Sequence, residues 1–194
     1  MRLTPVPPDA ALLALIVKSH GQSEADRYAS YVPTDDDFRN ALNVGLEVLR
    51  RTSPRPGSCA HLNALWTAIL RDHPRLPAHC VAGDLRARGK LAFGGSAQGF
   101  ERPFEASNGA WDGHCWMVLG DRIGDLSIFL TAYSLPPASN LRATVLQQFG
   151  PGRELLFERM DGVLEAGLEY VPRHVVTDEQ ITALVQGVDV TEQE

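Results

Sequence analysis

Apolar residues gather at helical spacing in three stretches of the first half of the chain. The first is the almost continuous apolar run Ala10–Val17, which follows Asp9, a residue type that caps helix starts, and ends near Gly21. The second is expected to begin after Thr34 with three aspartates, whose carboxylates suit the positive end of a helix dipole. It closes at Arg51.

The third predicted helix begins at Cys59, directly after the chain-breaking run Ser53-Pro54-Arg55-Pro56-Gly57, and ends at Asp72-His73-Pro74. Cys59 lies three residues before Leu62 and seven before Trp66, so it belongs to the apolar face of this helix. The thiol is therefore expected to point toward the body of the protein. That face is made of Leu62, Leu65, Trp66, Ile69 and Leu70.

The segments Gly113–Leu119 and Arg122–Ile128, on either side of Gly120-Asp121, predict a β-hairpin with a two-residue turn. Such a turn pairs Leu119 with Arg122, and the register then follows for the whole hairpin. His114 and Asp125 become diagonal neighbours on one face, within side-chain reach. Cys115 points to the opposite face. The shared face carries His114, Trp116, Val118, Ile123, Asp125 and Ser127.

The remaining segments give weaker signals. Leu76–Gly83 is typical of a strand, with Cys80 in the core. The glycine-rich stretch 90–110 is either a loop that borders a site or a plain surface excursion. A polar connection is expected over 22–33, and a second hairpin over 154–171 around Asp161-Gly162. Thr177 starts a capping box and a short last helix.

Composition narrows the class of protein. The 194 residues are 44% hydrophobic and 22% charged, which is typical of a folded protein, and we expect one domain over 1–194. A net charge of −6 argues against nucleic-acid binding and against anionic membranes. No apolar run approaches the roughly 20 residues that span a bilayer. Three cysteines without a C-x-x-C pair favour free thiols and a cytoplasmic location.

A thiol at a helix start is where thiolate forms most readily, because the first N–H groups of a helix have no partner within it. With His114 as base and Asp125 orienting the imidazole, Cys59 has the partners that nucleophilic thiol catalysis needs. Trp116 is expected to flank the substrate. The alternative is structural: a buried small Cys59, a hydrogen-bonded His114 and a turn carboxylate at Asp125.

These residues resemble the transglutaminase-like branch of the papain-like cysteine protease superfamily. The likeness rests on Gly57-Ser58-Cys59-Ala60-His61-Leu62, on the strand Leu76–Gly83, and on His114-Cys115-Trp116 followed by Ile123-Gly124-Asp125-Leu126-Ser127. It covers about residues 36–130. The resemblance implies an α+β fold in which N-terminal helices, including the cysteine helix, pack on an antiparallel β-sheet. It also implies the triad Cys59, His114 and Asp125.

The activity expected from this resemblance is hydrolysis or acyl transfer at an amide or related acyl bond of a peptide or small molecule, through a thioester and without a cofactor or metal. Arylamine N-acetyltransferases share the Cys–His–Asp order, although here the approach to the cysteine is Arg55-Pro56-Gly57 and His61 stands two positions after it. A catalytically silent relative that binds a partner is the third possibility. The sequence leaves the substrate, the second oxyanion donor and the oligomeric state open.

Overall fold

The computed structural model describes residues 9–73, 75–94 and 112–188, and within these ranges the chain is an α+β protein. Its helices are α1 (Ala10–His20), α2 (Gln22–Ser30), α3 (Asp35–Arg51), α4 (Cys59–Asp72), α5 (Ile128–Ser134), α6 (Asn140–Phe149), α7 (Met160–Glu165) and α8 (Asp178–Gln186). Its strands are β1 (His79–Ala87), β2 (Lys90–Phe93), β3 (His114–Leu119), β4 (Arg122–Asp125), β5 (Leu156–Arg159) and β6 (Leu168–Val175).

All six strands join one open antiparallel sheet with β1 at its centre. β6 pairs with β1 over 81–87, whereas β3 pairs with its first half, 79–83, and β2 with its last residues, 85–87. Because a strand has only two edges, β3 and β2 follow one another along the edge opposite β6. β4 and β5 then extend the sheet beyond β3.

The hairpin predicted around Gly120-Asp121 is confirmed, with its register, over the three pairs nearest the turn, and its second strand ends at Asp125. Leu119 lies opposite Arg122, and the next pairs are Val118 with Ile123 and Met117 with Gly124. Strand alternation then sends Cys115, Met117 and Leu119 to one face, and His114, Trp116 and Val118 to the other.

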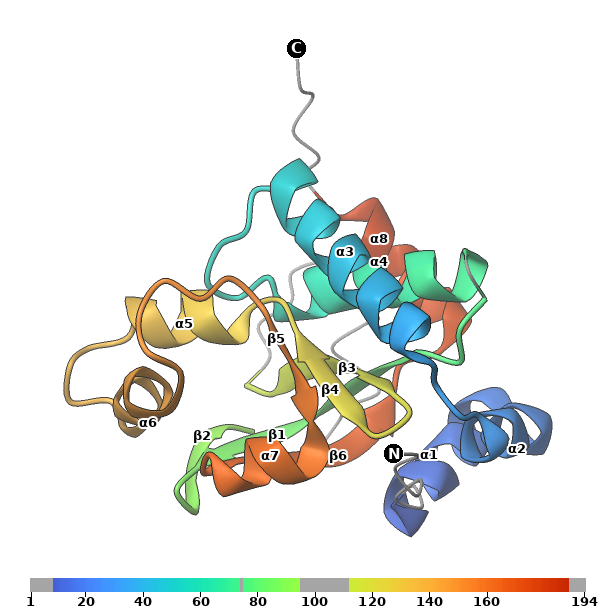
Figure 1. Cartoon of the computed structure of the whole chain (residues 1–194), viewed down its shortest axis with the longest axis horizontal. Helices are drawn as coiled ribbons and strands as arrows, with labels where there is room; N and C mark the ends of the chain where they lie inside the picture. Colours follow the sequence, from blue (N-terminus) through green and yellow to red (C-terminus); the bar gives the residue numbers. More distant parts are fainter. Residues whose placement is uncertain (1–8, 74, 95–111, 189–194) are drawn as a thin grey trace.

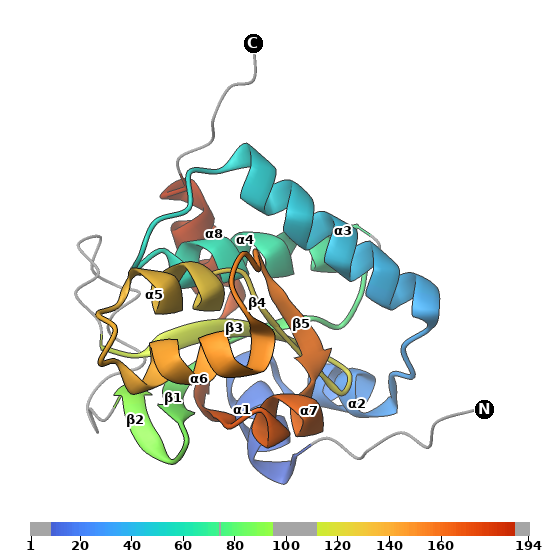
Figure 2. The ribbon, with the colours of Figure 1, turned by 60° about the vertical axis from the view of Figure 1, so that its left-hand side comes forward.

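Helix α4 packs on the sheet and covers its Cys115 face. Its Trp66 is fully buried there with Met117 and Leu119, and the indole N–H donates to the Ala41 carbonyl of α3 at 2.9 Å. Figures 1 and 2 show α3, α4 and α8 together above the sheet, and α1 and α7 below it. The papain-like arrangement implied by the resemblance stays a prediction, since the coarser α+β class is what the fold establishes.

The helix starts are also as predicted. Asp9 accepts a hydrogen bond from the Ala11 N–H, and Thr34 and Thr177 each form a complete capping box. In the described part of the chain no helix is long and apolar enough to cross a membrane.

Two predicted segments are wrong. The polar stretch expected as a connection over 22–33 contains α2, whose Ala25 and Tyr28 are buried against the sheet core. The hairpin expected around Asp161-Gly162 does not exist, because that turn is part of helix α7. Its two flanking strands separate: β5 pairs with β4, and β6 pairs with β1. The partners of β5 and β6 are therefore decided by pairing with the rest of the sheet and not by the Asp161-Gly162 turn between them.

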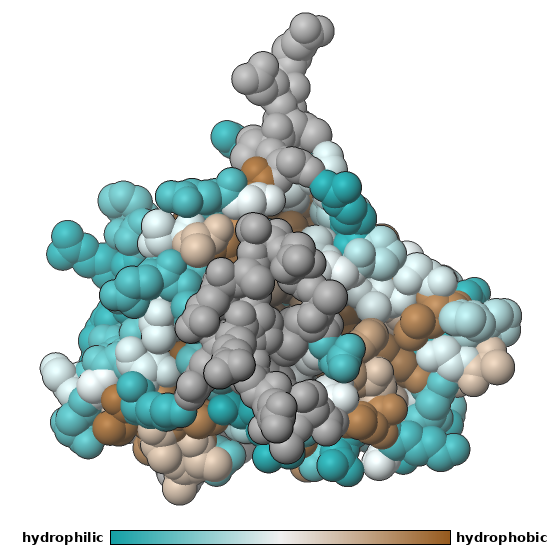
Figure 3. Space-filling view, turned by 180° about the vertical axis from the view of Figure 1, so that it is seen from behind, coloured by the Kyte–Doolittle hydropathy of each residue, from teal (hydrophilic) through white to brown (hydrophobic). Residues whose placement is uncertain are grey.

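A few large hydrophobic side chains are exposed on the described part of the chain. The face in Figure 3 is mainly teal and white with smaller brown groups between them. The exposed large hydrophobic side chains are spread over several elements and are Val17, Val32, Leu42, Leu91, Leu146 and Leu164.

Candidate active site

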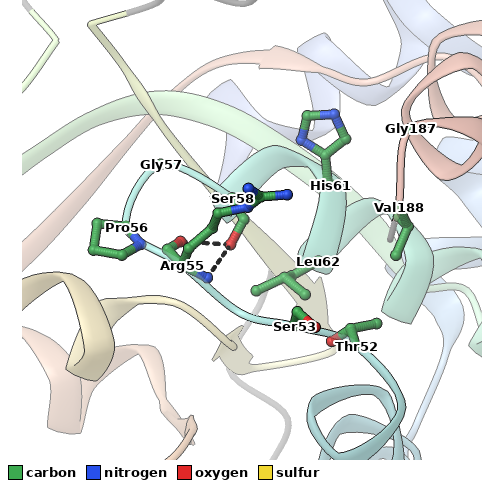
Figure 4. A pocket seen from close by; sticks show the side chains of 10 residues that line it. All are labelled: Thr52, Ser53, Arg55, Pro56, Gly57, Ser58, His61, Leu62, Gly187 and Val188. Atoms are coloured by element: carbon green, nitrogen blue, oxygen red, sulfur yellow. Dashed lines mark hydrogen bonds between the residues drawn. The ribbon is translucent and has the colours of Figure 1, made fainter. Parts of the chain in front are cut away.

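Cys59 is the first residue of α4, and the turn before it leaves the helix start without a side-chain cap. Ser58 occupies the cap position, but its hydroxyl donates to the Arg55 carbonyl at 2.7 Å and accepts from the Arg55 N–H at 3.3 Å (Figure 4). Gly57 supports this tight turn with φ of +93°, which favours glycine. The Ser58 side chain therefore accepts no hydrogen bond from the first-turn N–H groups of α4, and these groups are free of a side-chain cap. Such N–H groups favour an anion at the helix start.

The Cys59 side chain points toward the sheet, and the residue is 8% exposed. The Cys115 thiol donates a hydrogen bond to it and is the largest cause of a Cys59 pKa well below the usual value. Burial opposes this shift, while the His114 imidazole and the Cys115 backbone N–H add to it. The predicted helix-start thiol is therefore a thiolate held by three donors.

His114 opens β3 and is almost fully buried. Its Nε2 lies 2.5 Å from Asp125 Oδ2, which leaves Nδ1 as the nitrogen for the Cys59 thiol. Burial alone would lower the pKa of His114, but the charge and hydrogen bond of Asp125, together with Cys59, raise it to about 10. The lowered pKa of Cys59 and the raised pKa of His114 both favour the thiolate–imidazolium form of the pair.

Asp125 ends β4 with every acceptor position of its buried carboxylate in use. Oδ1 accepts from the Ser127 N–H at 2.9 Å, the Ser127 hydroxyl at 2.9 Å and the Ile128 N–H at 3.0 Å. Oδ2 accepts from His114 and from the Tyr170 hydroxyl at 3.0 Å. Burial would raise its pKa, yet these partners outweigh burial and hold the pKa below its ordinary value.

Asn63, one turn after Cys59, connects helix α4 with the ends of β3 and β4. Its side-chain N–H₂ donates to the Cys59 carbonyl at 3.0 Å and to the Cys115 carbonyl at 2.9 Å, and its Oδ1 accepts from the Leu126 N–H at 3.2 Å. Continued hairpin register would pair Cys115 with Leu126. Asn63 bridges these two backbone groups instead, and the freed Cys115 N–H bonds the Cys59 sulfur.

Aromatic rings enclose the imidazole. Phe93 stacks on His114 with ring centroids 5.6 Å apart, Trp116 lies 6.4 Å away, and Tyr170 is tilted at 6.0 Å. Trp116 is 2% exposed and contacts Tyr170 at 5.1 Å. The structure thus places Trp116 as packing beside His114, and its predicted contact with substrate stays a prediction.

The structure brings together Cys59, His114 and Asp125. Helix α4 packs on the face of the sheet opposite His114, and Cys59 at its start still reaches the His114 imidazole. Sequence reasoning missed Asn63, Tyr170 and Phe93. Asn63 alone carried a signal, because a buried amide on an apolar helix face needs partners. Tyr170 follows Asp125 by 45 residues, and no local pattern joins them.

The sequence offers two further polar residues to such a site, the carboxylate of Asp121 in the hairpin turn and the amide of Gln98 in the glycine-rich stretch. Asp121, the rival carboxylate, pairs with Arg159 at 3.0 Å in the hairpin turn. Gln98, a possible second oxyanion donor, lies outside the described residues, as does most of the glycine-rich stretch 90–110. Among the residues described, no group of three or more His, Cys, Asp or Glu side chains is placed to hold a metal ion.

A hollow of about 250 Å³ lies beside the helix start. Figure 4 shows Arg55 and Ser58 on one side of it and His61 on the first turn of α4. Cys59 is not part of its wall, because the thiol points to the sheet. The lining residues are Thr52, Ser53, Arg55, Pro56, Gly57, Ser58, His61, Leu62, Gly187 and Val188.

Comparison of the chain with protein-family models, with curated proteins and with solved structures found no match in any of the three.

Proposed function

We propose that this protein is a cysteine-dependent hydrolase or acyltransferase that acts on an amide or related acyl bond, with a papain-like, transglutaminase-like arrangement of its catalytic core. One observation carries the proposal: Cys59, His114 and Asp125, from three separate elements, form a single buried chain of hydrogen bonds that ends in an acidic thiol. A structural cysteine has no need of an imidazolium and a carboxylate behind it, and burying those charges is costly.

The chemistry follows from the roles of the three groups. The Cys59 thiolate attacks the acyl carbon, and the His114 imidazolium gives its proton to the leaving amine or alcohol as the bond to carbon breaks. Asp125 keeps the imidazole oriented and stabilises its charge. A thioester remains on Cys59. Water or an amine then attacks it, His114 accepts the proton, and the thiolate leaves with the acyl product released.

The uncapped start of α4 is a suitable binding position for the oxyanion of the reaction. The Cys59 N–H is the first donor for the negative oxygen of the tetrahedral intermediate, and it acts together with the positive end of the helix. Ser58 does not compete for these groups, since its hydroxyl is engaged with Arg55. Substrate would then enter from the helix-start side, next to the hollow that Ser58 and His61 line.

The first experiment measures the acidity of the thiol. Alkylation of Cys59 by iodoacetamide is followed against pH, with peptide mass spectrometry to separate Cys59 from Cys80 and Cys115. We expect a rate that is already maximal near neutral pH, and a midpoint that rises toward or above the roughly 8.5 of a free cysteine in His114→Gln. The matched control is His61→Gln, on the same helix turn but outside the triad, which should leave the profile unchanged.

A second experiment asks whether an acyl group is transferred. The protein is mixed with p-nitrophenyl acetate, and the acetyl group is sought on Cys59 by mass spectrometry. Acetyl-Cys59 that forms rapidly, and is then lost by hydrolysis in the buffer or on adding an amine acceptor, supports catalysis. An ordinary alkylation midpoint unaffected by His114→Gln, together with no acetyl-Cys59, would instead favour a catalytically silent protein that binds a partner.

A further inference from the structure

The three cysteines of the chain form one contiguous group of sulfurs. Cys59, Cys80 and Cys115 are all free thiols and lie together in the small core between α4, α8 and the sheet. The Cys115 thiol hydrogen-bonds both the Cys59 sulfur and the Cys80 sulfur. The strand register explains the second contact, since Cys115 pairs with Ala82, two residues from Cys80 on the same face.

The three sulfurs differ in exposure and in charge. Cys59 is 8% exposed, whereas Cys80 and Cys115 are both 0% exposed. A small oxidant from solvent therefore meets Cys59 first. Cys59 is also the ionised member of the group, and the thiolate is the form that peroxides oxidise. Burial, together with Cys59 and Cys80, raises the pKa of Cys115 well above its ordinary value. Cys115 is therefore a neutral thiol beside Cys59.

We propose that Cys115 is the resolving thiol of Cys59, so that a peroxide converts the pair into a reversible Cys59–Cys115 disulfide. In the first step the Cys59 thiolate attacks hydrogen peroxide: the O–O bond breaks, Cys59 becomes a sulfenic acid, and the departing hydroxide takes a proton and leaves as water. The peroxide is reduced and the sulfur is oxidised by two electrons.

In the second step the Cys115 sulfur attacks the sulfenic sulfur. The S–S bond forms, the S–O bond breaks, and hydroxide leaves as water with the proton that Cys115 releases. His114 lies against Cys59 and can pass that proton to the leaving hydroxide. The two side chains already hydrogen-bond each other, so closure to a bond of about 2.05 Å needs side-chain movement rather than exchange of strands. An external dithiol restores both thiols.

This chemistry protects the nucleophile. Without a resolving partner, a sulfenic acid proceeds to sulfinic acid, which ordinary thiols do not reduce. The inference rests on the ionised Cys59 that the proposed function also requires. It goes beyond that function, because it assigns a role to Cys115, which sequence reasoning treated as a buried bystander.

The test treats the full-length protein with hydrogen peroxide and maps the products by non-reducing peptide mass spectrometry. We expect a Cys59–Cys115 linkage, loss of Cys59 alkylation by at least about tenfold, and recovery with dithiothreitol. In Cys115→Ala the same treatment should give sulfenic acid, trapped by dimedone, and then sulfinic acid on Cys59. Cys80→Ala is the matched control, equally buried and next to Cys115, and should still form the disulfide.

The outcomes separate the two proposals. Sulfinic acid on Cys59 at the same rate in the unaltered protein and in Cys115→Ala would overturn the resolving role, even with an acidic Cys59. Linkage of Cys80 to Cys115 in place of Cys59 would overturn it as well. An ordinary Cys59 in the alkylation profile would instead refute the proposed function. Because each substitution changes a buried side chain, thermal unfolding curves of each variant establish that the fold is retained.

Discussion

His79 is a fully buried histidine whose two ring nitrogens have no hydrogen-bond partner. It begins β1 and lies against α1 and α2, with the His20 ring centroid at 5.1 Å and the Tyr28 ring at 5.4 Å. The Glu24 carboxylate is 3.5 Å from Nε2 but outside hydrogen-bonding geometry. Burial, followed by the charges of His20, Arg71 and Arg27, lowers the pKa of His79 to about 2. The folded protein therefore holds this ring neutral.

The sign of the stability effect follows from that shift. The unfolded chain protonates His79 at a pKa of 6.5, but the folded chain does not do so until about 2, so stability is lost as pH falls through this window. Between about pH 7.5 and pH 5 the loss amounts to about 2 kcal/mol in unfolding free energy. His114 acts in the opposite sense, because its folded pKa is raised to about 10 and its stabilisation is fully present only below 6.5.

The assay compares urea unfolding of the unaltered protein and of His79→Leu at both pH values. Taking the difference between the two proteins removes the contribution of His114, whose strand partner is Gly83, at the other end of the β1–β3 pairing from His79. We expect the variant to lose about 2 kcal/mol less on acidification. His79→Gln, also unable to titrate, should behave alike. A difference below about 0.5 kcal/mol would refute the reasoning and would mean that Glu24 turns to pair with a protonated His79.

Two further predictions concern the supports of the triad. Tyr170→Phe should cost about 1.5–3 kcal/mol in urea unfolding, because it removes a buried hydrogen bond to a carboxylate. Tyr133→Phe loses neutral hydrogen bonds only, at 2.8 Å to the Gly150 carbonyl and at 3.3 Å from the Arg153 N–H, and should cost about 1 kcal/mol; equal costs would contradict the charge-assisted bond. Asn63→Ala should cost more than about 2 kcal/mol and shift the Cys59 alkylation midpoint upward, while Thr67→Val, one turn along, should leave that midpoint unchanged.

The parts of the site that sequence could predict are those fixed by local rules. A two-residue turn at Gly120-Asp121 determines the register of the whole hairpin, and the register alone brings His114 near Asp125. The position of Cys59 at a helix start follows from the proline–glycine run before it. Neither step needs a long-range contact, and for that reason both were accessible without coordinates.

What escaped prediction depends on distant partners. Tyr170 reaches Asp125 only because β6 pairs with β1, and the local turn at Asp161-Gly162 pointed to a different partner for that strand. Helix α2 has too few apolar residues to stand out in sequence, yet Ala25 and Tyr28 bury it. Its stability comes from tertiary packing and not from its own pattern.

The break in the hairpin ladder at Cys115 and Leu126 connects fold and chemistry. A continued ladder would satisfy both backbone groups at no cost, but it would leave the Cys115 N–H unavailable to sulfur. Asn63 donates to the carbonyl of Cys115 and accepts from the N–H of Leu126, so these two backbone groups keep partners where the strands part. The single N–H that this arrangement releases is the one that stabilises the Cys59 thiolate. A purely structural core would gain nothing from replacing the ladder hydrogen bonds by those of Asn63. The replacement gives up backbone hydrogen bonds and buries an amide and an anion. The geometry is therefore best explained by a requirement for a charged sulfur at that point in the fold.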